Sequence, residues 1–269
     1  MSPTILASRA LVRVSGAEAA PFLQGLLSND VPGASAAQWR FAALLNPQGK
    51  ILFDMLILST SDGFWLDVRA DSSASLIKRL GMYRLRSKVD FVDASLTHHV
   101  VVGEGALPLG LAAPDPRHDA LGWRAIMPGP AKAGDESPWH RRRISAFVPE
   151  GGVDFAFGDI FPHEANMDRL HGLDFTKGCY VGQEVVSRVE HRGLARRRFI
   201  PMNYRRDSPP PGTPLLAGDV EIGVTGSSAG GICLALVRLD RLAAAGGKAM
   251  AGMIELTALF APDGGENHG

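Results

Sequence analysis

The chain has 269 residues, of which 45% are hydrophobic, and its 28 basic residues balance 28 acidic ones. Such a chain can bury one large core or divide into two or three modules, and we expect a soluble globular protein. The balanced charge excludes a global field that would recruit nucleic acid or an anionic membrane, and no apolar run reaches the roughly 18 residues of a membrane span.

The first part of the chain predicts a strand, a helix and a hairpin. Alternation over Leu11–Val14 indicates a half-buried strand. The next helix is expected to begin near Pro21, because a proline in its interior would remove a hydrogen bond. Residues 41–45 and 51–58 flank Asn46–Gly49, which favours a type I turn between two strands.

The following elements extend this region into an α+β unit. A strand is expected over residues 64–68, a helix capped by Asp71 follows, and a strand over 89–92 completes the unit. Residues 105–138 are rich in Ala, Gly and Pro, and we expect the most loop-like part of the chain there, with one short strand over 123–127.

A second compositional break, Pro209–Gly212, precedes the last part of the chain. Short apolar segments divided by glycine-rich turns follow it and predict a small β-barrel. The expected strands cover residues 220–224, 231–237 and 253–260.

Two cysteines, Cys179 and Cys233, are too few for a disulfide framework, or for a four-thiolate cluster or zinc site within one chain. The simplest interpretation is a reducing compartment. The first residues contain no long apolar stretch typical of a signal peptide and lead at once into a strand-like segment. We therefore expect a cytoplasmic bacterial protein.

A thiol stands between an ammonium and the expected start of a helix in the octapeptide KGCYVGQE, residues 177–184. Residues 184–192 have the pattern of a short amphipathic helix with Glu184 and Arg188 four apart. The helix start and Lys177 should lower the pKa of the Cys179 thiol below its usual value of roughly 8.5. The alternative is a buried, inert cysteine, which is our interpretation of Cys233.

The octapeptide is accompanied by other recognisable blocks. Residues 162–168 read PHEANMD, residues 22–31 read FLQGLLSNDV, and Ser187-Arg188 and Arg192-Gly193 follow the octapeptide. In these blocks, and over nearly its whole length, the chain resembles the YgfZ family. That family comprises folate-binding relatives of the aminomethyltransferase of the glycine cleavage system and includes mitochondrial proteins that help assemble [4Fe-4S] clusters.

The resemblance implies an α+β fold in which antiparallel sheets and helices surround a central channel for tetrahydrofolate. The cysteine motif would lie at the edge of that channel. The implied domains are an aminomethyltransferase-like folate-binding module over residues 1–198, with two interleaved subdomains, and a small β-barrel over residues 199–269.

The resemblance also implies site residues. Glu184 and the pair Asn29 and Asp30 match positions at the folate site of the aminomethyltransferases, and a carboxylate suits the N–H donors of a pterin edge. Without the resemblance, we would read Glu184 as an ion-pair partner of Arg188. The residues expected at the cofactor are Asn29, Asp30, Asn166, Glu184 and Arg188, and the motif residues around the thiol are Gly178, Tyr180, Gly182 and Gln183.

One position departs from the aminomethyltransferases. Those enzymes have two adjacent aspartates after the glycine hairpin, and the first acts on the folate, whereas this chain has Phe53 there. Phenylalanine cannot transfer a proton, and Asp54 should face the other side of the strand. We therefore expect a folate binder that has lost the transferase chemistry.

Two basic clusters and one histidine have open interpretations. Residues 140–143 and residues 191–192 with 196–198 are either solvated faces or a site where arginines bind the carboxylates of a folate. His163, beside Glu164, suits a turn cap better than a ligand or proton relay.

The leading hypothesis is a tetrahydrofolate-binding accessory protein for the assembly or repair of [4Fe-4S] clusters, supporting iron-sulfur enzymes that include tRNA-modifying ones. Its partners would be assembly or client proteins, and neither membrane nor nucleic acid. Cys179, assisted by Lys177, would be a nucleophile, a persulfide carrier or one ligand of a transient cluster shared with a partner. The alternatives are a folate-dependent one-carbon transferase and a non-catalytic protein-binding scaffold.

Overall fold

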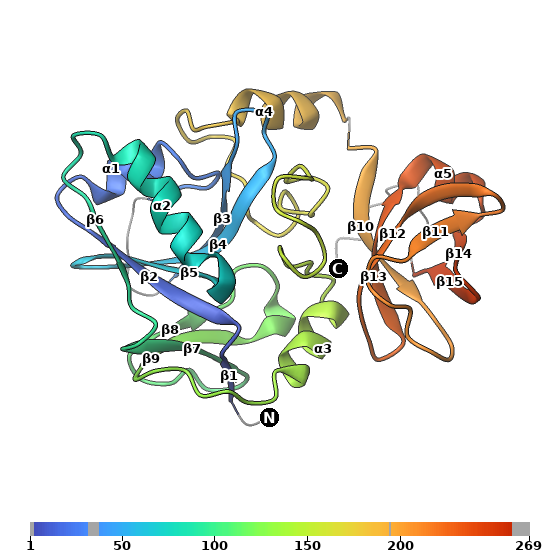
Figure 1. The fold of residues 1–269 in the computed structure, drawn as a ribbon, viewed down its shortest axis with the longest axis horizontal. Coiled ribbons are helices and arrows are strands. Elements are labelled where there is room, and N and C mark those ends of the chain that lie inside the picture. Colours follow the sequence, from blue (N-terminus) through green and yellow to red (C-terminus); the bar gives the residue numbers. More distant parts are fainter. Residues whose placement is uncertain (1–2, 32–37, 194, 260–269) are drawn as a thin grey trace.

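The computed structural model describes residues 3–31, 38–193 and 195–259 (Figure 1). Two open antiparallel sheets lie on one side of the molecule and a closed barrel lies on the other. No helix within the described ranges is long and apolar enough to cross a membrane.

The amino-terminal half is built on a five-stranded sheet with strand order β3-β4-β5-β2-β6. Two helices, α1 (Ala19–Gln24) and α2 (Ser73–Arg84), pack their apolar side chains on this sheet, where Leu23 and Leu80 join Val12 and Leu66 in one buried cluster. The strands are β2 (Arg9–Ser15), β3 (Trp39–Leu45), β4 (Ile51–Thr60), β5 (Gly63–Arg69) and β6 (Asp90–Asp93).

The predicted hairpin is confirmed. Strands β3 and β4 pair antiparallel with Leu44 opposite Phe53. In the turn, the Asn46 carbonyl accepts a hydrogen bond from the Gly49 N–H at 2.9 Å, as a type I turn requires.

The first predicted helix is confirmed, whereas the predicted cap of the second is wrong. Helix α1 begins near Pro21, at Ala19, and tolerates the proline because in the first turn it lacks only an N–H that would have no intrahelical partner. Asp71 does not cap α2, since its carboxylate accepts from Arg69 Nη2 at 2.6 Å, and a 3-10 turn over Ala70–Ser72 precedes the helix.

A four-stranded sheet with order β1-β7-β9-β8 packs beside the first. The interval 105–138, predicted to be loop-like, contains two of its strands and the 3-10 turn Asp119–Leu121, so it is more regular than its composition suggests. The strands are β1 (Thr4–Leu6), β7 (His98–Gly103), β8 (Leu111–Pro114) and β9 (Trp123–Pro128), and helix α3 spans Ser137–Ser145.

The longest stretch without a helix or strand is residues 146–182, which occupies the middle of the molecule between the sheets and the barrel (Figure 1). Its apolar side chains, among them Ile160, Met167 and Tyr180, belong to the largest buried cluster, which also includes Trp39 of β3 and Leu234 of the barrel. This segment therefore joins the two halves. It leads into helix α4 (Gln183–Arg192), which confirms the helix predicted after the octapeptide.

The carboxyl-terminal region forms the predicted barrel, closed in the order β10-β13-β12-β11-β14-β15. Alternate side chains such as Met202, Cys233 and Leu256 fill its interior. Three of its strands went unpredicted because they are short or begin with arginines. The elements are β10 (Arg197–Asn203), β11 (Pro214–Ala217), β12 (Val220–Ala229), β13 (Ile232–Arg238), α5 (Leu239–Ala244), β14 (Lys248–Ala251) and β15 (Ile254–Ala258).

Candidate functional site

Cys179 lies on the surface, on the loop that leads into α4. The alternative of a buried, inert cysteine therefore does not apply at this position. The neighbouring Gly178 is also exposed, and a Cβ atom there would meet no atom within 4 Å. Close packing is thus not the reason for glycine at position 178, and the thiol is open to a partner molecule.

Lys177 anchors this loop to the amino-terminal block. Its ammonium donates hydrogen bonds to the backbone carbonyls of Gln24 at 2.9 Å, Leu27 at 2.6 Å and Asn29 at 2.8 Å. Three acceptors engage all three donors of an ammonium group. Burial lowers the pKa of Lys177 to about 8. The structure therefore adds a role to the predicted one, because the Lys177 ammonium is a buried anchor of the loop.

Asp174 and Tyr180 hold the two sides of the loop. Asp174 Oδ1 accepts from the N–H groups of Thr176 at 2.7 Å and Lys177 at 3.1 Å. Partial burial favours the neutral acid, but these hydrogen bonds lower the pKa of Asp174. Tyr180 is buried with its ring 5.2 Å from Lys177 Nζ, and burial raises its pKa to about 12. The loop is therefore fixed on both sides while the thiol stays exposed.

Gly182 brings the start of α4 against the turn of the β3–β4 hairpin. It has φ +83°, and a Cβ atom there would lie 2.7 Å from the Asn46 carbonyl oxygen and 3.1 Å from Gly49 Cα. Only glycine combines this backbone conformation with so close an approach. The next residue, Gln183, is the first of α4.

Asn29 and Asp30 lie in the amino-terminal block, where the Asn29 carbonyl accepts from Lys177 of this loop. The Asn29 amide donates to the carbonyls of Phe41 at 2.8 Å and His171 at 2.7 Å, which uses both of its donors. Asp30 accepts from Gln24 Nε2 at 2.7 Å. Through the hydrogen bonds of Lys177, the octapeptide and the block 22–31, two of the blocks that carry the family resemblance, thus meet in space although about 150 residues separate them.

Glu184 and Arg188 form an i,i+4 ion pair at 2.8 Å on the solvent side of α4, where the Glu184 side chain is 85% exposed. Asn166 lies elsewhere, in the irregular segment, and donates to the Phe199 carbonyl at 2.8 Å. Of the residues predicted at the cofactor, Asn29 and Asn166 are thus buried and bonded to backbone carbonyls, whereas Glu184 and Arg188 lie at the surface.

The position expected to carry the transferase acid is filled by aromatic packing. The partly exposed Phe53 ring lies 5.9 Å from that of Phe157. Asp54 faces the opposite side of β4, as predicted, where it is buried and accepts from the Gly151 N–H at 3.1 Å. Burial raises the pKa of Asp54, and its Oδ1 has no hydrogen-bond partner among the described residues.

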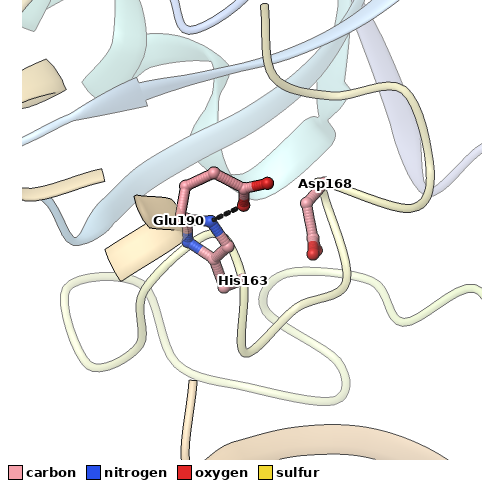
Figure 2. A group of neighbouring side chains, drawn as sticks. All are labelled: His163, Asp168 and Glu190. Carbon is pink, nitrogen blue, oxygen red and sulfur yellow. Dashed lines mark hydrogen bonds and ion pairs between the residues drawn. The ribbon is translucent and has the colours of Figure 1, made fainter. Parts of the chain in front are cut away.

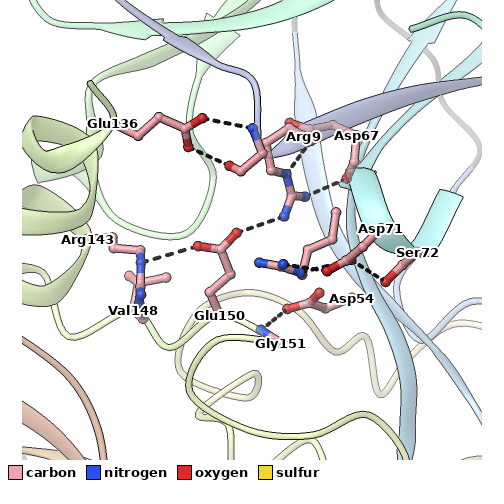
Figure 3. Close-up of polar contacts among 12 residues, drawn as sticks. Arg9, Asp54, Asp67, Asp71, Ser72, Glu136, Arg143, Val148, Glu150 and Gly151 are labelled. Atoms are coloured by element: carbon pink, nitrogen blue, oxygen red, sulfur yellow. Dashed lines mark hydrogen bonds and ion pairs between the residues drawn. The ribbon is translucent and has the colours of Figure 1, made fainter. Parts of the chain in front are cut away.

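A network of buried charges lies beside Asp54 (Figure 3). Arg9 contacts Asp67 Oδ1 at 2.6 Å and Glu150 Oε1 at 3.0 Å, and Glu150 Oε2 lies 3.2 Å from Arg143 Nε. Burial alone would raise the pKa of Glu150, but Arg9 and Arg143 lower it to about 2. Four guanidinium groups face four carboxylates in this network, which consists of Arg9, Arg117, Arg124 and Arg143 with Asp67, Asp115, Glu150 and Asp154.

This network was not predicted. The sequence offers one indication, the acidic Asp67 within an apolar strand. That indication does not reveal which distant arginines pair with the Asp67 carboxylate. The network ties β2 and β5 to α3 and the segment after it, so it stabilises the fold.

A second polar group joins the irregular segment to α4 (Figure 2). The buried His163 Nε2 lies 2.9 Å from Glu190 Oε2, and ligand-type atoms of His163, Asp168 and Glu190 lie within 4.8 Å of one another, a spacing compatible with a metal ion. Arg198 nevertheless engages both Asp168 oxygens, at 2.8 and 2.6 Å. The charge of Asp168 is therefore already compensated, and we interpret the group as a structural link between the irregular segment and α4.

Cys233 is fully buried in the barrel, and burial raises its pKa to about 11, which confirms that it is a core residue. Since the chain contains two cysteines, Cys179 is its one exposed thiol.

Comparisons with known proteins agree with this architecture. Residues 196–262 match the family model described as the CAF17 C-terminal beta-barrel domain. Aminomethyltransferase T of the glycine cleavage system from Bartonella henselae superposes with a TM-score of 0.76 at 16% identity, covering 97% of this chain and 85% of that one. This likeness confirms the predicted fold, with its carboxyl-terminal barrel, and at such low identity shows the fold alone.

Relatives in sequence carry a function in their names. The human mitochondrial iron-sulfur cluster assembly factor IBA57 is 32% identical over 88% of this chain and 77% of that protein. A mitochondrial homologue of this factor from Neurospora crassa is 35% identical over 74% of this chain. The chain spans 52% of the Neurospora protein, about half of its length.

The predicted location is wrong. These relatives are named as mitochondrial, as are those from Mycosarcoma maydis and Mus musculus, whereas we expected a bacterial cytoplasmic protein. The expectation came from the composition of the first residues, and that composition does not determine where a protein works.

Proposed function

Because the chain belongs to the family of the iron-sulfur cluster assembly factor IBA57, we propose that it acts in iron-sulfur cluster assembly with Cys179 as its working thiol. Its partners would be other assembly proteins or the client enzymes that receive the cluster. Iron-sulfur cluster assembly is inferred from the relatives, and the role of Cys179 from the structure of this chain.

The observation that carries the proposal is an exposed thiol on an anchored loop. Cys179 is exposed, while Lys177 and Tyr180 on either side of it are buried. A thiol held in this way can approach a partner without first ordering a flexible segment, which reduces the entropy cost of association.

The number of thiols limits what this residue can do. A [4Fe-4S] cluster is usually held by four cysteine thiolates, and this chain offers one at its surface. A cluster bound at Cys179 must therefore take its remaining ligands from a partner. A single accessible thiol can also carry a persulfide or act as a nucleophile; the cluster ligand and the persulfide are the two roles that can be distinguished in isolated protein.

The test is complementation of cells that lack their own factor of this family. We would express the wild type, Cys179→Ser and Cys233→Ala, and measure the abundance of each protein and the activities of one [4Fe-4S] enzyme and one enzyme without a cluster. We expect Cys179→Ser to lose most of the [4Fe-4S] activity at normal abundance, and Cys233→Ala to retain it. Full rescue by Cys179→Ser at normal abundance would refute the role of this thiol.

Mass spectrometry of the protein isolated from the same cells separates the two chemistries. A persulfide adds one sulfur atom to the peptide that contains Cys179, whereas a shared ligand leaves the thiol unmodified and brings a partner chain and iron along during anaerobic purification. The Cys233 peptide provides the internal control because its thiol is buried.

The finer part of the proposal is tetrahydrofolate binding and support of tRNA-modifying iron-sulfur enzymes, as the resemblance to the YgfZ family implies. The partly exposed rings of Phe53 and Phe157 support it by offering a surface on which a pterin can stack. Calorimetric titration with reduced tetrahydrofolate, on the wild type, Phe157→Ala, Glu184→Gln and Cys179→Ser, tests the binding.

Weaker binding by Phe157→Ala alone would locate the ligand at the aromatic pair. Weaker binding by Glu184→Gln would indicate that the Glu184 carboxylate contacts the pterin. The absence of binding in all four proteins would favour a scaffold that binds only proteins. The tRNA modifications made by [4Fe-4S] enzymes, measured in the complemented cells, test the second half of this proposal.

A further inference from the structure

A small cavity lies where α4, the irregular segment and the barrel meet. Its volume is about 280 Å³, and its wall includes Phe161 and Val189, with Glu164, Arg196, Arg197 and Arg238 around them. We propose that this cavity binds a small oxyanion, the carboxylate or phosphate group of a small molecule. The proposal does not depend on the role of Cys179.

The wall of the cavity carries more positive than negative charge. Three guanidinium groups line it together with one carboxylate, that of Glu164. Both Glu164 oxygens already have partners within the protein, because Oε1 accepts from Arg197 Nε at 2.7 Å and Oε2 accepts from the Phe161 N–H at 2.9 Å. The Glu164 carboxylate is therefore bonded to Arg197 and to the backbone, and the three arginines outnumber it around the cavity.

Arg196 is the third arginine of the cavity wall. Within the described ranges its guanidinium takes part in no hydrogen bond or ion pair, although its backbone carbonyl accepts from the Leu239 N–H at 3.0 Å and so fixes the position of the main chain. Arg238 contacts Asp240 through Nε and Nη2, at 3.1 and 2.6 Å, which leaves its Nη1 for another acceptor.

The register of the barrel brings two of the guanidinium groups together. Arg197 of β10 and Arg238 of β13 are directly opposite each other in the antiparallel pair, so their side chains lie on the same face. Each is paired with a carboxylate, but Arg197 contacts Glu164 through Nε alone, which leaves its two Nη groups beside Nη1 of Arg238 within the described ranges. An oxyanion between the two side chains would accept charge-assisted hydrogen bonds from these groups, and the planar guanidinium fork suits both carboxylate and phosphate.

The size of the cavity restricts the ligand. A volume of about 280 Å³ exceeds the roughly 30 Å³ share of one water molecule several-fold, so it can hold one anionic group with a short body attached. The apolar surfaces of Phe161 and Val189 suit a few carbon atoms next to the anion.

Calorimetric titration at constant ionic strength tests the proposal, with inorganic phosphate in one arm and the dicarboxylate glutarate in the other. The variants are Arg196→Ala and a matched control, Arg192→Ala, which removes an exposed arginine from the same basic segment but not from the cavity wall. We expect saturable binding by the wild type, about a tenfold weaker affinity in Arg196→Ala, equal to about 1.4 kcal/mol, and little change in Arg192→Ala.

Binding of one anion and not the other would support the site and identify its chemistry, and binding of both would show that charge alone is recognised there. Two results would overturn the proposal. One is the absence of saturable binding of either anion by the wild type, and the other is an equal loss in Arg196→Ala and Arg192→Ala, which would indicate diffuse attraction to the basic segment.

Discussion

Replacement of Lys177 by methionine should release the loop that carries Cys179. Methionine keeps much of the side-chain length and apolar stem but removes the three donors that reach the carbonyls of Gln24, Leu27 and Asn29. Because these carbonyls belong to the amino-terminal block, the substitution separates two parts of the chain that the wild type holds together.

The expected loss of free energy of unfolding follows from these hydrogen bonds. Each hydrogen bond to a charged group contributes about 1.5–3 kcal/mol, and a buried acceptor left without a donor costs about 1–3 kcal/mol. Burial of the ammonium, which lowers the pKa of Lys177 to about 8, opposes part of this gain. We therefore expect Lys177→Met to lower the free energy of unfolding by about 2–4 kcal/mol, a large part of the stability of a typical domain.

Two measurements check this expectation. Chemical denaturation gives the free energy of unfolding, and the rate of alkylation of Cys179 reports the mobility of the loop, which should rise in the variant. Lys78→Met, at an exposed lysine on α2, controls for the loss of a charge. A Lys177→Met protein with unchanged stability and an unchanged alkylation rate would show that the three hydrogen bonds do not hold the loop.

Three further predictions concern the support of the site. Gly182→Ala should lower the melting temperature, because Gly182 has φ +83° and a Cβ atom there would lie 2.7 Å from the Asn46 carbonyl oxygen. Gly178→Ala should leave the melting temperature unchanged, because a Cβ atom there would meet no atom within 4 Å. Equal effects of the two substitutions would contradict this packing. Glu150→Gln should cost about 3–5 kcal/mol in chemical denaturation at pH 7, because it leaves buried guanidinium groups uncompensated. The pKa of Glu150 is lowered from 4.5 to about 2, so its ionisation contributes about 3 kcal/mol to the free energy of unfolding above pH 4.5, and this contribution is lost as the pH falls toward 2. The free energy of unfolding of the variant should therefore decrease less on acidification than that of the wild type. The same pH dependence in both proteins would argue against the ion pairs. A thiol reagent should modify one cysteine per chain in the native protein and two in denaturant, since burial raises the pKa of Cys233 to about 11; rapid native modification of both would contradict the closed barrel.

Local features of this protein could be predicted from its sequence. The β3–β4 hairpin forms around Asn46 and Gly49 because those residues favour the turn itself, and helix α4 follows from a spacing of apolar and charged residues within one short segment. Both depend on neighbours a few positions apart. The overall fold was accessible for a different reason, namely the resemblance carried by the octapeptide and its accompanying blocks.

The environment of the site residues was not accessible in this way. Glu184 was expected at a cofactor, but its position on the outer face of α4 leaves it in solvent with Arg188. Lys177 was expected beside the thiol as a positive charge, and its sequence position did not reveal that three carbonyls of the amino-terminal block would accept hydrogen bonds from its ammonium. In each case the residue type was informative, and the direction of the side chain depended on elements far away in the sequence.

The sequence by itself determined the local turns and helices, the number of thiols and the family to which the chain is related. Only the tertiary structure decided that Cys179 is exposed, that Lys177 is an anchor, and that Arg9, Arg143 and Glu150 compensate one another in the interior. The physical reason is that burial and charge pairing depend on which distant segments meet. Those contacts form when the irregular segment 146–182 packs between the sheets and the barrel.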